Sequence, residues 1–377
     1  MILKVNTAQF VNLAKTVTKG VGKDLSSQLV LTVGADNTLG LSYNSASSVI
    51  AGKVPFVADD TVEPIELCIS GNQLKTATSL IIVNEEALRL EIDDIVTIKV
   101  GSSEFKVPVI DAPIAKVDTA TEEYGTVTGV EFIKIISELS KLLSTDSVLQ
   151  NHPASCLNII STGDKLNIVA TNTFGLVEKT CDFNGEAFHV LLKPAQVGVL
   201  LNAFTPGAMV KLIHNKSRFG FYNEDDILHL VSFSNMKPLE YGVFKETAAT
   251  ENSFTANIEE FKYAIQAMTR LSPDSNQIWL NIKGDKIEFR NTNHDTIDIT
   301  LDADTGDNRT VVEFGAVTLN ILVGYIADKI RVNYGSNRGN QILKIESLVK
   351  GADNTYSVDD TIFITVGVSV MHVEQGS

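Results

Sequence analysis

The sequence predicts an α+β protein made of three tandem repeats, each with two short helices packed on antiparallel sheets. Strand-like phrases that begin with a polar turn recur along the chain, as in "GDKLNIVAT" from Gly163 and "GDKIEFRNT" from Gly284. Self-similarity at a fixed interval is the sequence signature of repeated structural units. The chain also has 377 residues, more than the ~250–300 at which a single core usually stops growing. We therefore expect several similar domains.

Each repeat opens with an amphipathic helix. The three segments are "TAQFVNLAKTVTKGV" from Thr7, "TGVEFIKIISELSKLL" from Thr128 and "NIEEFKYAIQAMTRL" from Asn257. In each of them apolar residues recur at helical spacing and form one stripe. The anchors Phe10, Phe132 and Phe261 follow one another at intervals of about 125 residues.

A hairpin with a polar turn follows each opening helix. Leu39, Leu166 and Ile287 occupy equivalent positions in the three hairpins. A strand and a second helix come next, over residues 65–81, 188–204 and 310–326, in which Ile81, Phe204 and Tyr325 correspond.

Strands with alternating polarity close each repeat, which suits half-buried antiparallel sheets. Polar linkers separate the repeats. The pattern predicts domains at 1–120, 125–246 and 252–377.

Composition narrows the class of protein. The sequence contains neither a long apolar run nor a leader peptide, and its three cysteines lack metal-ligand spacing, so we expect a cytoplasmic protein with small buried cysteines. No catalytic or metal-binding signature is complete, which predicts no enzyme, no metal and no cofactor. The net charge of −15 describes the total and leaves open where the charges lie.

The helix geometry gathers cations on one face. Lys15 and Lys19 lie opposite the apolar stripe of the first helix, and Lys134 and Lys141 opposite that of the second. Arg270 takes the corresponding side of the third helix. Surface helices commonly carry lysines, so the pattern is also compatible with an ordinary solvated face.

The three repeats resemble the bacterial β sliding clamp, the DNA polymerase III β subunit family. The most specific segments are "CLNIISTGDKLNIVATNTFGLV", "FTANIEEFKYAIQA" and "VEFGAVTLNILVGYI". The resemblance implies a head-to-tail homodimer whose six domains close a ring around duplex DNA, with the helices lining the hole. It further implies sequence-independent binding of double-stranded DNA, and DNA polymerase, clamp loader and other clamp-binding-motif proteins as partners.

Sites carry over from the family residue by residue. Lys23 falls where clamps carry a basic residue that contacts DNA, so the predicted DNA-binding residues are Lys15, Lys19, Lys23, Lys134, Lys141 and Arg270. The predicted dimer interface contains Phe105 and Val107 on an edge strand and Leu271 on the partner surface. The predicted peptide cleft contains Leu157, Thr171, Phe174, Gly175, Leu176, Pro238, Tyr241, Val243, Val368 and Val370.

This chain departs from the family at the cleft. It carries "TNTFGL" where clamps typically have a His-Arg pair, and its tail "VSVMHVEQGS" lacks the usual Met-rich ending. These departures are typical of a divergent clamp such as a phage would encode. The alternative is a β-rich structural or interaction repeat protein that binds no DNA, which would have no need of basic helix faces in all three repeats.

Overall fold

The computed structural model describes most of the chain, with gaps between the described stretches. The described residues are 1–21, 28–83, 86–114, 121–143, 152–171, 175–203, 209–223, 225–238, 240–271, 277–291, 293–300, 310–315, 328–335, 339–351 and 353–369.

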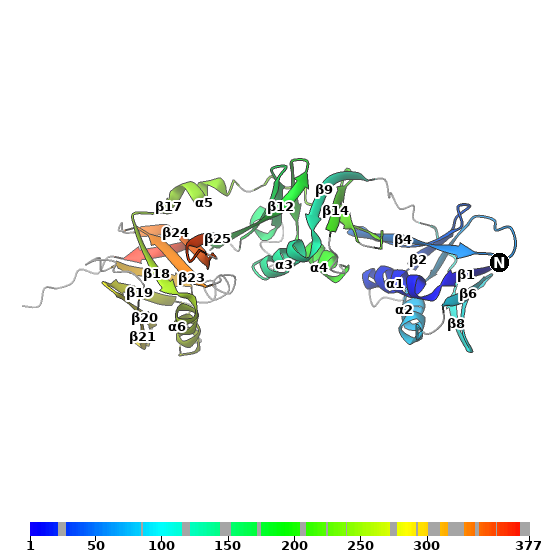
Figure 1. Cartoon of the computed structure of the whole chain (residues 1–377), viewed down its shortest axis with the longest axis horizontal. Coiled ribbons are helices and arrows are strands. Elements are labelled where there is room, and N and C mark those ends of the chain that lie inside the picture. Colours follow the sequence, from blue (N-terminus) through cyan, green and yellow to red (C-terminus); the bar gives the residue numbers. More distant parts are fainter. Residues whose placement is uncertain are drawn as a thin grey trace, which may run out of the picture. The chain divides into compact units, whose positions relative to one another are not determined.

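One order of elements recurs three times along the chain, as the repeats predict (Figure 1). The first series consists of β1 (Ile2–Asn6), α1 (Thr7–Val17), η1 (Thr18–Gly20), β2 (Gln28–Val33), β3 (Thr38–Asn44), β4 (Ser48–Val57), β5 (Ile65–Ser70), α2 (Gly71–Leu80), β6 (Ala87–Ile92), β7 (Ile95–Val100) and β8 (Ser103–Pro108).

The second series repeats this order, including one 3-10 helix between the opening helix and the next strand. It consists of β9 (Glu122–Thr128), α3 (Gly129–Ser140), η2 (Pro153–Ser155), β10 (Leu157–Ser161), β11 (Lys165–Thr171), β12 (Gly175–Gly185), β13 (Phe188–Leu192), α4 (Pro194–Ala203), β14 (Met209–His214), β15 (Arg218–Tyr222) and β16 (Leu228–Ser232).

The third series follows a short connection formed by α5 (Gly242–Thr247) and β17 (Ala248–Ala249). It consists of β18 (Asn252–Asn257), α6 (Ile258–Leu271), β19 (Gln277–Lys283), β20 (Lys286–Asn291), β21 (Thr296–Thr300), β22 (Thr310–Gly315), β23 (Lys329–Tyr334), β24 (Gly339–Lys350) and β25 (Tyr356–Ser369). The second helix predicted for this repeat falls mostly on residues 316–327, outside the described residues.

The cores confirm the register of the repeats. Leu39, Leu166 and Ile287 are each fully buried at equivalent points of their hairpins. The helix anchors Phe10, Phe132 and Phe261 are at most 1% exposed. Each repeat therefore buries the same two positions, because an amphipathic helix and the inner face of a sheet must cover each other.

Contacts within the chain gather its residues into two compact units. The first contains Met1–Lys134, Ser161–Lys165 and Cys181–Ser234, and the second contains Ile135–Ile160, Leu166–Thr180 and Asn235–Ser377. The middle repeat contributes to both units, so this grouping follows different limits from the three repeats. The domain limits at 120–125 and 246–252 stay predictions.

The strands of the first unit form antiparallel sheets. One sheet has the order β4, β1, β6, β7, β8, and a second has the order β5, β2, β3, β4, β16, β15, β14, β9, β12. The strand β4 belongs to both. Its pairing with β16, in which Ala51 lies opposite Leu228, joins a strand of the first repeat to the sheet of the second.

The second unit contains the strands of the third repeat in the order β18, β23, β24, β25, β22, β19, β20, β21, all antiparallel. Residues Gly175–Glu178 of β12 pair with β25, and β17 runs parallel to β24. The α+β class with mainly antiparallel sheets is thereby confirmed.

Candidate nucleic-acid and partner interfaces

The helix α1 presents cations to solvent on the face opposite its core contacts. Asn6 caps its beginning, because the side chain accepts a hydrogen bond of 3.0 Å from the backbone N–H of Gln9. The predicted stripe of Phe10, Leu13, Ala14 and Val17 is buried. Lys15 and Lys19 are exposed, as the helical spacing predicts.

The helix α3 repeats this arrangement. Its stripe of Phe132, Ile135, Ile136 and Leu139 is buried, while Lys134 and Lys141 are exposed. One acid of this helix, Glu138, pairs with Lys179 at 3.1 Å, where the two side chains are mostly covered. That ion pair neutralises the carboxylate of Glu138.

The helix α6 has the same design in the second unit. The carboxamide oxygen of Asn257 accepts hydrogen bonds from the backbone N–H groups of Glu259 and Glu260, and these acids lie in the first turn, where the helix dipole favours them. The stripe of Phe261, Ala264, Ile265 and Met268 is buried. Arg270 is exposed in the last turn. All three opening helices therefore expose the predicted cations.

Three predicted site residues, Lys23, Phe174 and Val370, lie outside the described residues. Val368 lies in β25 opposite Val312, and its backbone alone is described. The predictions for these four side chains stay untested by the geometry.

The predicted cleft residues whose side chains are described lie within the second unit and differ in exposure. Leu157, Leu176 and Thr171 are at most 5% exposed, so the first two serve as core residues beneath any cleft surface. The Thr171 hydroxyl donates a 2.7 Å hydrogen bond to the Gly175 carbonyl, which fixes the start of β12. Pro238 and Tyr241 are half-buried, whereas Val243 is 54% exposed.

The short helix α5 begins directly after Tyr241 and carries Val243, and the sequence patterns did not predict it. Tyr241 packs with Val169, Leu176, Ala248 and Ile342 in one apolar cluster. A six-residue helix carries too little periodicity to be recognised in a sequence. It brings Lys245, also absent from the predicted site, over the ring of Tyr241 and into an ion pair with Glu178.

The predicted dimer residues lie at an edge strand and a helix end. Over Ser103–Pro108, β8 pairs with β7 and, among the described strands, with no other. Phe105 is half-buried against the first core, while Val107 is fully buried in it. Of these two side chains, Phe105 alone offers surface to a second chain. Leu271 is 50% exposed at the end of α6.

The described residues place no group of three or more His, Cys, Asp or Glu side chains where they could hold a metal ion. Cys68, Cys156 and Cys181 are buried, as predicted. Burial, with smaller contributions from Glu131 and Asp182, raises the pKa of the Cys181 thiol to about 12. Among the helices in the described ranges, none is long and apolar enough to cross a membrane.

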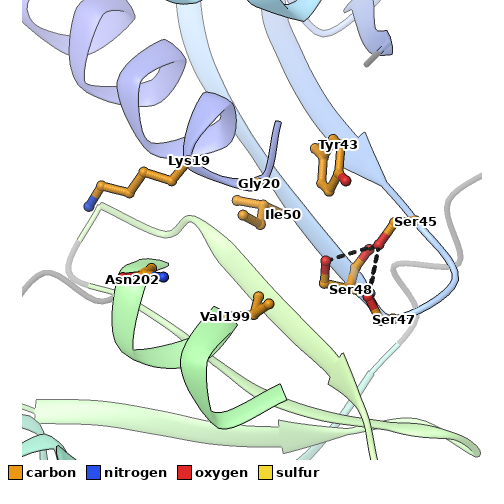
Figure 2. Close-up of a pocket in the computed structure, with 9 residues that line it drawn as sticks. All are labelled: Lys19, Gly20, Tyr43, Ser45, Ser47, Ser48, Ile50, Val199 and Asn202. Carbon is orange, nitrogen blue, oxygen red and sulfur yellow. Dashed lines mark hydrogen bonds between the residues drawn. The ribbon is translucent and has the colours of Figure 1, made fainter. Parts of the chain in front are cut away.

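A small cavity in the first unit adds a feature that the sequence patterns did not reveal. It lies between η1, the turn that joins β3 to β4, and α4 (Figure 2). Lys19 and the turn serines line it. The residues come from three segments far apart in the sequence, so no local pattern could bring them together.

No protein-family model matches the sequence, and no curated protein is similar enough in sequence to be matched. Solved structures do match. The DNA polymerase sliding clamp from Bacillus subtilis is 12% identical with a TM-score of 0.77, and the match covers 99% of this chain and 100% of that chain. The DNA polymerase III subunit beta from Pseudomonas aeruginosa is 14% identical with a TM-score of 0.76, covering 97% and 99%.

The DNA polymerase sliding clamp from Caulobacter crescentus is also similar, at 16% identity and a TM-score of 0.75, covering 97% of this chain and 99% of that chain. At such low identity the likeness establishes the fold, and this chain has the fold of those sliding clamps.

Proposed function

We propose that this chain is a cytoplasmic DNA sliding clamp, a homodimeric ring that encircles duplex DNA and tethers a replicative DNA polymerase to it. The observation that carries the proposal is the fold match, which spans nearly the whole of this chain and of each clamp. Exposed cations on α1, α3 and α6 support it further, because flexible lysines contact phosphates without reading bases. Such contacts retain the protein on DNA and still permit sliding.

In this proposal two chains of three repeats each join through two of the sheet edges in the described ranges, those of β8 and β21. Among the described strands, β8 pairs with β7 alone, and β21 pairs with β20 alone. An open edge offers unpaired backbone N–H and C=O groups to another chain. A head-to-tail contact that closes by rotation makes a ring rather than a filament. Phe105 and Leu271 are the side chains that we assign to this contact.

Partners dock, in this proposal, at the cleft formed by α5 and the start of β12. Tyr241, Val243 and Pro238 supply its accessible wall, with Leu176 beneath them. Apolar surface with a few polar groups suits short extended peptides from a polymerase, a clamp loader and other clamp-binding-motif proteins. Because a clamp holds its partners and transforms nothing, the proposal includes no catalytic residue and no cofactor.

Order of addition on blocked DNA tests the proposal. The protein is mixed with a linear duplex that carries biotin at both ends, streptavidin is added either before or after, and the complex is then washed in high salt. A ring threads over free ends and stays only when the blocks follow it. We expect salt-resistant retention when streptavidin is added second. Equal retention in both orders, or none in either, would contradict a topological link.

The same experiment tests the alternative, a structural repeat protein that does not bind DNA. For such a protein, retention on the duplex should not depend on the order of addition. The exposed cations on all three opening helices favour the clamp.

A further inference from the structure

A groove of about 790 Å³ lies within the first unit, over the strands β2, β3, β4 and β16 of its second sheet. Its volume falls within the ~300–1,000 Å³ of sites that hold ligands. Val30 and Thr32 line the groove and are half-buried, whereas Leu29 and Leu31 of the same strand are buried in the main core. Because side chains alternate across a strand, the groove lies on the face of the sheet opposite that core.

Small residues make the centre of this face hollow. Gly40 and Ser42 on β3 and Ala51 on β4 all line the groove, and Ser42 lies opposite Ala51 in the ladder. The larger side chains of Tyr222 and Leu228 line it on the neighbouring strands β15 and β16. The hollow therefore follows from residue size in the middle of a continuous sheet.

A separate apolar cluster borders the hollow. This cluster does not belong to the main core, and its buried members are Val49, Ile213, Leu228 and Leu230. Ala51 and Tyr222 are half-buried against it and also line the groove. The groove thus offers apolar surface to a large side chain of a ligand, which gains free energy when that surface is covered.

The repeats place this groove at the point that corresponds to the predicted peptide cleft. Because Leu39 and Leu166 are equivalent, Ser42 in the groove corresponds to Val169, which packs with Tyr241 beside the cleft. In both places a long strand continues the sheet into the next repeat, β4 by pairing with β16 and β12 by pairing with β25. This correspondence favours the same kind of ligand, a short segment of another protein.

Polar groups on the groove are available to such a segment. The hydroxyls of Thr32, Ser42 and Tyr222 have no hydrogen-bond partner in the part of the chain that the structure describes. Each hydroxyl can donate one hydrogen bond and accept others. An extended peptide carries unpaired backbone N–H and C=O groups that need such partners when they leave water.

The charges around the groove favour a basic ligand. Its lining contains two acids, Glu66 and Asp226, and one cation, Lys53. The Lys53 ammonium lies 3.8 Å from the carboxylate of Asp36, whereas neither lining acid forms an ion pair with a described cation. Two unpaired carboxylates beside one compensated cation attract positive charge.

The positions of the two acids indicate the length of the ligand. Glu66 lies on β5 and Asp226 directly precedes β16, with β2, β3 and β4 between these strands. Four strand spacings of ~4.8 Å separate β5 from β16 by about 19 Å, which about six extended residues span.

We propose that this groove docks a short, extended, basic segment of a partner protein. A large apolar side chain of the segment lies over Gly40, Ser42 and Ala51, and lysines or arginines near its two ends approach Glu66 and Asp226. This site is additional to the predicted peptide cleft of the second unit. It requires neither DNA nor a closed ring.

Two changes in the groove test the site. Gly40→Leu fills the hollow, and the fold should accept it because a Cβ at Gly40 would lie 3.5 Å from the Cβ of Thr32, an ordinary contact. The double change Glu66→Gln and Asp226→Asn removes both charges. Asn is chosen because Asp226 has a φ of 54°, a conformation that Asn tolerates well.

The matched control is the double change Glu63→Gln and Asp94→Asn. It alters the net charge by the same amount at two exposed acids of the first unit that do not line the groove. Melting temperatures equal to that of the wild type establish that each variant is folded. The charge variant decides the question if Gly40→Leu fails to fold.

Binding is measured without DNA, by fluorescence anisotropy of a labelled peptide of about eight residues. The peptide has lysines at both ends and leucine and phenylalanine between them, and a second peptide carries glutamates in place of the lysines. We expect the wild type to bind the lysine peptide at least about tenfold more tightly than the glutamate peptide. Gly40→Leu should weaken binding of the lysine peptide by about tenfold and the charge variant by about fivefold at low salt, whereas the control should bind it like the wild type.

Three results would overturn the site. They are equal affinity of the wild type for the two peptides, equal affinity of folded Gly40→Leu and wild type for the lysine peptide, and a lower mass of Gly40→Leu in light scattering, which would assign the groove to a second copy of this chain. Failure of the proposed function is a separate result, since it appears as retention on DNA that does not depend on the order of streptavidin addition.

Discussion

The ring of Tyr241 lies beneath the ammonium group of Lys245, with Nζ 5.3 Å from the ring centroid. The same ammonium is paired with the carboxylate of Glu178, which is 12% exposed. Lys245, the cation of α5, is thus already engaged in a cation–π contact and an ion pair. The wall offers Tyr241 and Val243 to a partner without a free positive charge. We therefore expect the cleft to prefer peptides rich in leucine and aromatic residues and to make little use of acidic flanks.

Val243→Glu tests this cleft without disturbing the core, because Val243 is 54% exposed. The new carboxylate would have to be desolvated under an apolar peptide, so affinity for a fluorescent peptide rich in leucine and phenylalanine should fall by at least about tenfold. Val57→Glu is the matched control, since Val57 is 66% exposed on β4 in the other unit. Equal affinity of both variants in fluorescence anisotropy would place the partner site elsewhere.

Leu271→Glu should convert the dimer to a monomer. The side chain is 50% exposed in one chain, and a large apolar side chain buried at an interface contributes roughly 1.5–3 kcal/mol. Light scattering should return about twice the 40.9 kDa chain mass for the wild type and about that mass for the variant. Tyr263→Glu, a change on the same helix at a residue 67% exposed, should leave the dimer intact. A wild type that stays monomeric at high concentration contradicts the ring.

Charge reversal on the opening helices should release DNA. We expect the combined change of Lys15, Lys134, Lys141 and Arg270 to Glu to abolish retention on end-blocked duplex. Each lost phosphate contact should also reduce the slope of log affinity against log salt by about 0.9. The fold should persist, because all four side chains are exposed.

A matched control separates position from net charge. It reverses the same number of cations on strands, at Lys53, Lys165, Lys211 and Lys286, all exposed. This control should keep both retention and the salt slope. If the two sets behave alike, the helices do not face the DNA.

His229 should make the protein less stable in mild acid. Its pKa falls from 6.5 to about 3 on folding, chiefly through burial. Between these values the unfolded chain binds a proton that the native chain excludes, so the free energy of unfolding is highest above pH 6.5 and decreases as the pH falls toward 3. The contribution of His229 to this decrease in the free energy of unfolding has an upper limit of roughly 4–5 kcal/mol.

His229→Phe should remove most of this pH dependence, because an apolar ring can pack on Phe221, whose centroid lies 5.0 Å from that of the imidazole. Urea titrations between pH 4 and 8 provide the measurement. The same slope in wild type and variant would show that His229 does not govern it.

Gly220 should tolerate no side chain. A Cβ there would lie 1.7 Å from the carbonyl oxygen of His229, in the strand paired with β15. Because backbone must move to make room, Gly220→Ala should lower the free energy of unfolding by about 2–4 kcal/mol. Gly198→Ala in α4 is the opposite case, since a Cβ there meets nothing within 4 Å. It should raise stability by about 0.5–1 kcal/mol, and a loss there would contradict the open space at α4.

The sequence alone determined the features that depend on local periodicity. The equivalent burial of Leu39, Leu166 and Ile287 follows from the alternation of each hairpin, and the exposure of Lys15 and Arg270 follows from helical spacing. These patterns recur in the chain because each repeat must cover a sheet with a helix. The α+β class, the order of elements and the cations of the opening helices were therefore predictable.

Only the tertiary structure decided which distant segments meet. The ladder that places Ala51 opposite Leu228 joins two repeats through residues 177 positions apart, and no local pattern specifies such a pairing. Packing likewise made Val107 a core residue, brought Lys245 onto Tyr241, and placed Lys19 beside α4. The physical reason is the same in each case. Periodicity determines which face of a helix or strand is apolar, whereas contacts between segments remote in sequence determine which residues its apolar and polar faces contact.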